Sequence, residues 1–298
     1  MSRPHKPSPH PANQASHEQR RTSAVQTDDL ETVRVTARAT EPDWYVAALL
    51  APGALRHDLI ALAAFGGEIR RIGHDVHDIM AAEIRLQWWR DALKAGAGGT
   101  ATGHPVADAC SKAIRRHNIA LHGFDDFLDA HAHALYQAPP PDANALMSEI
   151  DLKEGTLFRA SARILAGPNV TPADHDAIAA AAKAYGLMRV ALDLPYALAR
   201  ARQSLPDVMI CKTASSEPDW SETTAALARA IRISLADARR AFRTCQRAIR
   251  PAILPAALVE PYLGALEKQG HDPARDIAEI APLTRMWRMY YARWRGQL

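Results

Sequence analysis

Apolar residues recur at intervals of three and four from Pro42 onward, and no alternating strand pattern stands out. This period is typical of helices that bury one face. The pattern therefore predicts a single all-α domain over residues 41–298. Residues 1–40 offer few side chains to bury and are rich in Pro, His, Ser and Arg, so we expect a disordered N-terminal tail there.

The stretch of residues 62–93 predicts one long helix or two consecutive ones. Its apolar face is bordered by a polar strip, as on the wall of a pocket. The strip consists of Glu68, Arg71, Asp75 and Asp78. His74 and Asp78 are four residues apart and would share one face if a single helix continued through both.

Further helices are predicted downstream, with breaks at proline and glycine. One begins near residue 106, others cover residues 124–135, 148–165 and 223–249, and the last covers residues 286–295. Another starts at Thr171-Pro172 and is predicted to be interrupted near Pro195. Asp43 and Asp58 are candidate N-caps for the first two helices.

Two tryptophans and two histidines of these segments are predicted to have no functional role. We expect Trp88 and Trp89 to be core residues that pack between helices. His131 and His133 are two residues apart and do not share a helix face, so we expect both at the surface.

Composition and charge exclude several classes of protein. The formal net charge is +3, from 36 basic and 33 acidic residues among 298, which is too balanced to indicate nucleic acid as a partner. The three cysteines lie far apart, so a zinc ribbon and a disulfide framework are not expected, and a reducing cytoplasm is the expected location. No uncharged apolar run approaches the ~20 residues of a membrane span, and no secretory signal is predicted.

The segment of residues 286–295 alternates aromatic and basic side chains. Such segments occur at membrane interfaces, so peripheral membrane contact is one interpretation. The interpretation that we favour from the sequence is a last helix packed on the bundle, with arginine side chains that extend along it to solvent.

Several short segments occur together in an order that is typical of one protein family. They are Tyr45-Val-Ala-Ala-Leu, Leu62-Ala-Ala-Phe65, EIRLQWWRDAL at 83–93, Asp151-Leu-Lys-Glu-Gly-Thr156, Tyr185-Gly186, Leu205-Pro206, Pro251-Ala-Ile-Leu-Pro255 and Pro261-Tyr-Leu-Gly-Ala-Leu266. Taken together they resemble the squalene/phytoene synthase family. The resemblance implies an isoprenoid-synthase-type helical bundle around a central cavity. It also implies that active members join two isoprenyl diphosphates head to head with Mg²⁺ held by two aspartate-rich motifs.

The chain departs from this family where the metal ligands are expected. Aligned on Phe65, the first motif falls at residues 70–74, which read Arg-Arg-Ile-Gly-His. Aligned on Leu205-Pro206, the second falls at Asp193 and Ala197, so one carboxylate remains. Mg²⁺ prefers carboxylate oxygens and is repelled by guanidinium groups. We therefore expect no cofactor, or Mg²⁺ if the protein is catalytic.

Other residues near the two motifs are candidates for a rearranged site. The candidate catalytic carboxylates are Glu68, Asp75, Asp78 and Asp193, of which Asp78 and Asp193 are also weak metal candidates. The candidate diphosphate-binding residues are Arg70, Arg71, Arg200 and Arg202, because a guanidinium can hold two phosphate oxygens at once. The alternatives are a salt-bridged stripe, for instance Arg71 with Asp75, and a basic exposed helix end at residues 200–202.

One branch of the family, which includes the mitochondrial complex I assembly factor, resembles this chain more than active synthases do. The matching residues are Ala64-Phe65, Glu68 and Pro195-Tyr196. The resemblance predicts a non-catalytic or atypical protein that binds an isoprenoid, another lipid or a protein partner. The alternatives are an active prenyltransferase that condenses isoprenyl diphosphates, and a helical scaffold with neither ligand nor activity.

Overall fold

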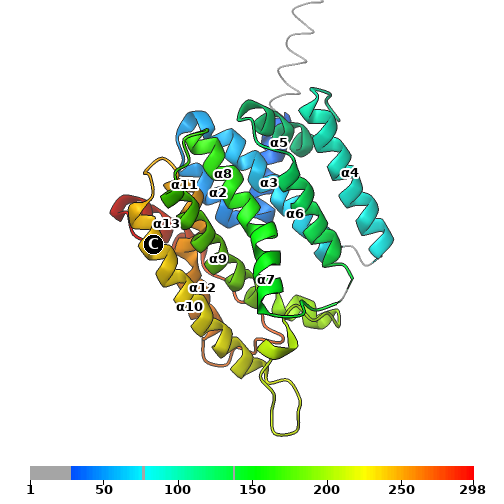
Figure 1. Cartoon of the computed structure of the whole chain (residues 1–298), viewed down its shortest axis with the longest axis vertical. Helices are drawn as coiled ribbons and strands as arrows, with labels where there is room; N and C mark the ends of the chain where they lie inside the picture. Colours follow the sequence, from blue (N-terminus) through cyan, green and yellow to red (C-terminus); the bar gives the residue numbers. More distant parts are fainter. Residues whose placement is uncertain (1–27, 76–77, 137) are drawn as a thin grey trace, which may run out of the picture.

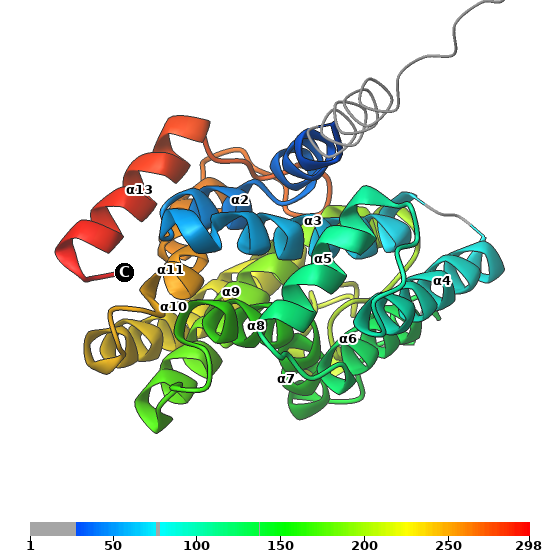
Figure 2. The ribbon, with the colours of Figure 1, turned by 90° about the horizontal axis from the view of Figure 1, so that it is seen from above.

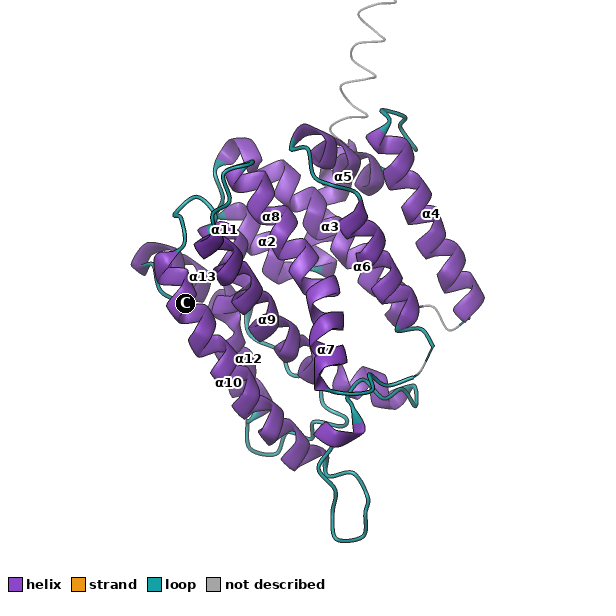
Figure 3. Ribbon diagram, viewed as in Figure 1, coloured by secondary structure: helices purple, strands orange, loops and turns teal. Residues whose placement is uncertain are grey.

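The computed structural model describes residues 28–75, 78–136 and 138–298. Within these ranges the regular structure is helical, and the β-pairing consists of an isolated bridge between Lys212 and Pro218 (Figures 1 and 3). The predicted all-α fold is thus confirmed. No helix in the described ranges is long and apolar enough to cross a membrane.

Most helices follow one another with short connections, and longer segments, 200–219 and 267–281, precede α10 and α13. Their bounds are α2 Pro42–Leu49, α3 Gly53–Asp75, α4 Ile79–Ala97, α5 Pro105–Arg116, α6 His122–His133, α7 Ala143–Ile150, α8 Thr156–Ala166, α9 Pro172–Ala199, α10 Trp220–Thr244, α11 Arg250–Ile253, α12 Val259–Leu266 and α13 Pro282–Arg295. A π-helical turn, η1, covers Asp151–Gly155 between α7 and α8, and 3₁₀ turns cover Asp207–Met209 (η2) and Leu254–Leu258 (η3).

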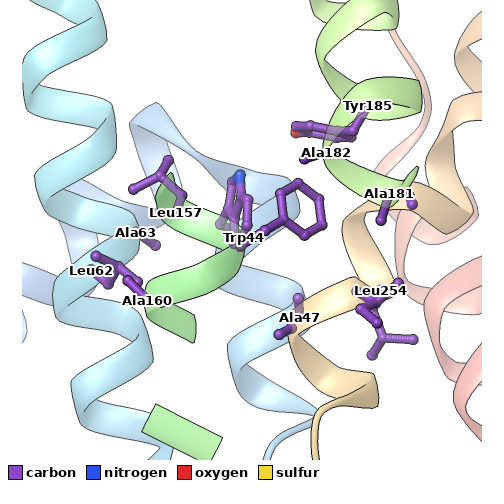
Figure 4. Packing of buried hydrophobic residues seen from close by; sticks show 14 of the residues in the cluster. Trp44, Ala47, Leu62, Ala63, Leu157, Ala160, Ala181, Ala182, Tyr185 and Leu254 are labelled. Atoms are coloured by element: carbon purple, nitrogen blue, oxygen red, sulfur yellow. The ribbon is translucent and has the colours of Figure 1, made fainter. Parts of the chain in front are cut away.

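The core lies where α2, α3, α8 and α9 meet. Trp44 of α2 packs edge-on against Phe158 of α8, with 4.7 Å between ring centroids, and against Tyr185 of α9. Figure 4 shows Trp44 close to Leu157 and Ala160, with Tyr185 on the facing helix. The prediction for the tryptophan pair is half right, because Trp89 is buried whereas Trp88 is 42% exposed.

The predicted disordered tail is wrong in its last part. Residues 28–40 form a helix, in which Val33 and Ala37 are buried. These two small apolar residues are four apart, so they share the face that packs on the bundle. The remaining part of the predicted tail, residues 1–27, lies outside the described residues.

Gly67 of α3 allows this N-terminal helix to pack closely. A Cβ added at Gly67 would lie 1.9 Å from Thr40 Oγ1 and 2.5 Å from Thr40 Cβ. We expect Gly67→Ala to lower the free energy of unfolding by about 1–3 kcal/mol, because the backbones must separate. Chemical denaturation would measure it.

Gly73→Ala is the matched control on the same helix. A Cβ at Gly73 meets nothing within 4 Å, so alanine should leave stability unchanged or raise it by up to about 1 kcal/mol through helix propensity. Equal stabilisation by both substitutions would contradict the close contact at Gly67.

Three local predictions are wrong: two helix caps and one helix interruption. In each case contacts with other parts of the structure outweigh the local preference of the sequence. Asp43 lies inside α2, buried, and accepts hydrogen bonds from Tyr185, Tyr262 and Arg285. Asp58 lies inside α3, where it pairs with Arg116 at the end of α5 and with His117, the residue after that helix, instead of capping α3. Helix α9 starts at Pro172 with a capping box at Thr171, as expected, but it continues through Pro195 to Ala199.

Residues 62–93 form parts of two helices, which is one of the two predicted arrangements. Helix α3 ends at Asp75 and α4 begins at Ile79. Asp78 is the N-cap of α4, where its side chain accepts a hydrogen bond from the Met80 amide at 2.9 Å. His74 lies in the last turn of α3 whereas Asp78 caps α4, so the two do not share the face of one helix.

Candidate functional site

A pocket of about 200 Å³ lies between α3, α6, α7, η1 and α9. Its apolar wall comes largely from the end of α6, from α7 and from α9, with Leu135, Leu146, Ile150 and Val190. Its polar wall comes from α3, η1, α9 and the segment after α9. The polar lining residues are Arg70, His74, His131, Glu149, Lys153, Glu154, Arg189, Asp193, Tyr196, Arg200, Arg202, Gln203 and Ser204.

The floor of this pocket is a buried ion network centred on Arg70. The Arg70 Nε donates to Glu41 Oε1 at 2.6 Å, and its Nη1 donates to Glu154 Oε1 at 3.0 Å. Arg189 of α9 adds two longer bonds to Glu41, each of 3.4 Å. The side chain of Glu41 is 0% exposed and that of Glu154 is 4% exposed. Two guanidinium groups and two carboxylates thus balance one another away from solvent.

The pKa shifts show how strongly these charges depend on one another. Burial opposes the charge on Arg70, and so does Arg189, yet Glu154 and Glu41 raise the pKa of Arg70 above its usual value. Burial raises the pKa of Glu41, but Arg189 and Arg70 outweigh it and hold that pKa below its usual value. Both groups are therefore ionised at neutral pH, and removing the partners of either one would leave a buried charge unpaired and destabilise the fold.

The local structure explains how Glu154 reaches this network. Residues 151–155 form a π-helical turn inside an otherwise continuous helix of α7 and α8. Such a turn carries one extra residue and re-aims side chains, and it occurs often at functional sites. Gly186 of α9 lets η1 approach, because an added Cβ would lie 2.3 Å from Ile150 Cγ2 and 3.3 Å from Glu154 Cγ.

Positions from both segments aligned with the aspartate-rich motifs line this one pocket, although Arg71 and Ile72 of the first segment line another groove. Arg70, Gly73 and His74 come from α3, and Asp193 and Ala197 come from α9. The charge of Asp193 acts on both Arg70 and His74, in each case in the direction that raises the pKa. Burial nevertheless lowers the pKa of His74 below its usual value, aided by nearby arginines. The Arg70 guanidinium therefore stands in the register of the first motif, and Asp193 is the carboxylate that remains of the second.

Arg200 and Arg202 line the pocket where α9 ends. Both donate to the carbonyl oxygen of Gly73, at 3.2 and 3.3 Å. In the described ranges neither has a carboxylate within ion-pair distance. Burial and the neighbouring charge of Arg200 lower the pKa of Arg202. An anion placed between the two guanidinium groups would relieve this repulsion.

Several buried polar atoms of the pocket lack a hydrogen-bond partner among the described residues. They are His131 Nε2, Glu154 Oε2, Arg189 Nε, Arg202 Nε and Ser204 Oγ. Buried polar groups in folded proteins are nearly always paired, so a group of orphaned atoms around one pocket indicates a polar ligand or ordered water. The two arginine Nε atoms can only donate, and the Ser204 hydroxyl can also donate, which suits an oxyanion.

The polar strip on α3 faces a different groove. Glu68, Arg71 and Asp75 line it together with Arg85, Trp88, Trp89 and His104. Arg71 pairs with Asp75 at 3.0 Å and lies 3.7 Å from Glu68, as in the salt-bridged alternative. The structure therefore separates the candidates into two sets. Arg70, Asp193, Arg200 and Arg202 share the pocket, whereas Glu68, Arg71 and Asp75 do not, and Asp78 caps a helix.

The residues present do not suit the Mg²⁺ that the resemblance implies for active members. In the pocket the carboxylates of Glu154 and Glu149 are already paired, with Arg70 and Lys153 respectively. Asp193 stands among arginines, whose charge opposes a divalent cation. In the described part of the chain no three His, Cys, Asp or Glu side chains gather as metal ligands would.

The sequence did not identify three residues of this site, and it predicted a fourth at the surface. Glu41 and Arg189 carry no motif, and only the fold brings them to Arg70. Glu154 lies within the segment that resembles the cavity-facing helix, so that segment held a usable signal. His131, expected at the surface, lines the pocket and packs edge-on against Phe127 at 4.7 Å.

His131 should make stability depend on pH. Burial, helped by Lys153 and Arg70, lowers its pKa well below the usual value. Because the unfolded chain then binds the extra proton, the free energy of unfolding should fall as pH drops below about 6.5, by up to about 1.4 kcal/mol per pH unit for one such histidine. His131→Gln should lose that share of the slope between pH 7.5 and 5.5.

Denaturant unfolding at several pH values would test this expectation. The matched control is His122→Gln, at an exposed histidine of the same helix. An unchanged slope in His131→Gln, or an equal change in both variants, would contradict a neutral buried imidazole at residue 131.

The chain is similar in sequence and in fold to known proteins. The family model described as squalene/phytoene synthase matches residues 37–295. The chain is 25% identical over 244 residues to the protein from Bos taurus named NADH dehydrogenase (ubiquinone) complex I, assembly factor 6, a match that covers 79% of this chain and 73% of that protein.

Two solved structures share the fold. A dehydrosqualene synthase in complex with ligand superposes with a TM-score of 0.71 at 15% identity, over 90% of this chain and 97% of that one. The squalene synthase HpnC from Alicyclobacillus acidocaldarius superposes with a TM-score of 0.67 at 18% identity, over 84% and 97%. Family match, fold and the order of the sequence segments agree: the chain belongs to the squalene/phytoene synthase family.

Proposed function

We propose that this protein is a non-catalytic member of its family that holds one phosphate-bearing lipid or isoprenoid in its pocket and works as an assembly factor. The observation that carries the proposal is the position of Arg70. Its guanidinium stands in the register of the first metal motif and binds the carboxylates of Glu41 and Glu154. A metal ion there would have to displace a buried cation from two buried anions, which is strongly unfavourable.

The size of the pocket supports a single ligand. Its volume of about 200 Å³ is below the ~300–1,000 Å³ of pockets that hold drug-sized molecules. A volume of this size favours a phosphate-bearing head with the first part of one isoprenyl chain over the two long chains that head-to-head condensation requires.

The charges of the pocket support one position for the head group of this ligand. Arg200 and Arg202 are the pocket's guanidinium groups without a carboxylate partner in the described ranges, and Arg202 Nε and Ser204 Oγ are orphaned beside them. The apolar wall of Leu135, Leu146 and Ile150 suits the chain of the same ligand. This division of a pocket into a cationic end and an apolar wall is typical of sites for amphiphilic anions.

Binding of inorganic pyrophosphate to the full chain would test the head-group site. Calorimetric titration should detect binding without Mg²⁺, and Arg200→Gln or Arg202→Gln should weaken it about tenfold, since each removes charge-assisted hydrogen bonds. Arg71→Gln is the matched control, because Arg71 lies in the other groove and is more than half exposed. Equal affinity in all variants would contradict the assignment.

An activity assay tests the non-catalytic part of the proposal directly. The purified protein with farnesyl diphosphate and Mg²⁺ should release no diphosphate above the level of a heat-denatured sample. Robust Mg²⁺-dependent release would overturn the proposal and favour an active prenyltransferase with a rearranged site.

The role in assembly rests on the name of the relative from Bos taurus, whose similarity extends over most of both chains. Deleting the gene in its own host should lower the amount of intact complex I-type NADH dehydrogenase on native gels. Wild-type protein should restore it, and a variant with both Arg200→Gln and Arg202→Gln should restore less. Normal levels of the intact complex after deletion would reject this role.

A further inference from the structure

Helix α13 exposes a continuous stripe of large apolar and aromatic side chains. The stripe consists of Leu283, Met286, Trp287, Tyr290 and Trp294, all exposed. Their spacing of three and four residues puts them on one face of the helix. Trp287 and Trp294 are 70% and 71% exposed, which is unusual for the residue type that buries the most apolar area.

The opposite face of α13 is the one that packs on the bundle. Met289 and Ala292 are buried, and Arg285 donates to the buried carboxylate of Asp43. The helix contacts η3 and α2 on that side. The apolar stripe thus points away from the protein, the reverse of an ordinary surface helix. Figure 2 shows α13 (red) at the edge of the bundle, on the side away from α4.

The charged residues of α13 itself have one sign. Helix α13 carries four arginines and no acidic residue. Arg293 and Arg295 are exposed, and Arg295 lies over the rings of Tyr291 and Trp294 at 5.3 and 5.4 Å. An aromatic stripe flanked by arginines is the composition of helices that lie in the head-group region of a bilayer.

The neighbouring surface extends this positive charge. Arg239 near the end of α10 donates to the carbonyl oxygen of Leu298, which holds Leu298 against that helix, and its charge is paired with Glu260 at 3.5 Å. Beyond it, Arg243 and Arg247 are exposed. A surface that combines exposed tryptophan with several arginines complements an anionic lipid surface, where each basic residue strengthens binding. A protein partner with an apolar groove would need no such excess of cations.

We propose that α13 is a membrane-docking helix that lies in the head-group layer of an anionic bilayer with Trp287 and Trp294 inserted. Helix α13 contributes no residue to the lining of the pocket, so this surface is separate from the ligand site. The protein would bind the membrane peripherally through α13, while the pocket remains on another part of the bundle.

Co-sedimentation of the full chain with vesicles tests the proposal. Binding should be detected with vesicles that contain phosphatidylglycerol and should be much weaker with pure phosphatidylcholine. Changing Trp287 and Trp294 together to Ala should reduce the partition coefficient about tenfold or more, since binding follows the apolar area inserted. Arg293→Gln should reduce it about fivefold at low salt and less at high salt.

Two controls separate docking from other effects. Met80 and Ile233 are exposed apolar residues of other helices, and changing both to Ala should leave vesicle binding unchanged. Arg200→Gln alters the pocket but not α13, so binding retained in that variant distinguishes surface docking from lipid taken up by the pocket. Both tryptophans are exposed, so their replacement should leave the unfolding transition unchanged, and circular dichroism would verify this.

Several results would overturn the proposal. They are no binding to anionic vesicles, equal binding to neutral ones, and undiminished binding after loss of both tryptophans. Self-association of the chain that disappears with the tryptophans, without any vesicle binding, would assign the stripe to a second copy of the chain instead and would also overturn it.

Discussion

Arg70→Met is expected to lower the free energy of unfolding by about 3–5 kcal/mol, the cost of leaving buried charges without their partner. Arg70 bonds to both Glu41 and Glu154, whose side chains are almost fully buried. Methionine fills much of the same volume, so the loss reports the missing charge rather than a cavity. Thermal or denaturant unfolding of the full chain would measure it.

Arg71→Met supplies the matched control, because residue 71 is the next one on the same helix. Arg71 is 57% exposed and pairs with Asp75 near solvent. Such pairs contribute little, so the variant should stay within about 1 kcal/mol of the wild type. Adding Glu154→Gln to Arg70→Met should recover part of the loss, since it removes one uncompensated carboxylate. Equal effects at residues 70 and 71 would refute the buried network.

Arg285→Met is expected to be the second most damaging substitution at neutral pH, at about 3 kcal/mol or more. Arg285 Nε donates to Asp43, which also accepts from Tyr185 at 2.9 Å and from Tyr262 at 3.2 Å. Without Arg285 the buried carboxylate keeps only neutral donors, and α13 loses its polar anchor to α2.

The damage at Arg285 should shrink as pH falls. Burial already raises the pKa of Asp43 above its usual value, although Arg285 opposes the shift. In Arg285→Met this opposition is gone, so the folded pKa should rise further above the unfolded one. The folded variant then binds a proton more readily than the unfolded chain, and its stability is lost as pH rises through the folded pKa.

Unfolding at pH 5 and at pH 8 would test this sign. The difference in unfolding free energy between wild type and Arg285→Met should be larger at pH 8. Arg288→Met, on the same helix, is the control and should show a small difference at both pH values. A loss that grows toward acid would contradict a protonatable Asp43 as the cause.

The tertiary structure separates the carboxylates that lie near Arg70 in the sequence from those that bind it. Glu68 and Asp75 are close to Arg70 in sequence, but a helix rotates successive residues by about 100°, so they face the other groove. Glu41 and Glu154 reach Arg70 from other segments and bind it as ion-pair partners. The floor of the pocket is thus held together by ion pairs between side chains of the protein.

Local and periodic features of the sequence were sufficient for the fold class. The three-to-four spacing of apolar residues predicted an all-α protein, and Thr171-Pro172 marked a helix start that the structure retains. The order of short segments around Phe65 predicted the family. These properties depend on neighbours in the chain, and such neighbours are visible without a structure.

Only the tertiary structure decided which charged residues act together. Asp43 and Asp58 had the local appearance of helix caps, yet each is buried and satisfied by side chains from other helices. The sequence also did not show which face of α13 packs on the bundle, because the spacing of its apolar residues fits burial as well as exposure. The packed face is the one that carries Met289, Ala292 and Arg285. The sequence by itself determined the helices and the family. The packing of helices distant in the chain determined which charges are buried together, because burial and electrostatic pairing depend on separation in space and not along the chain.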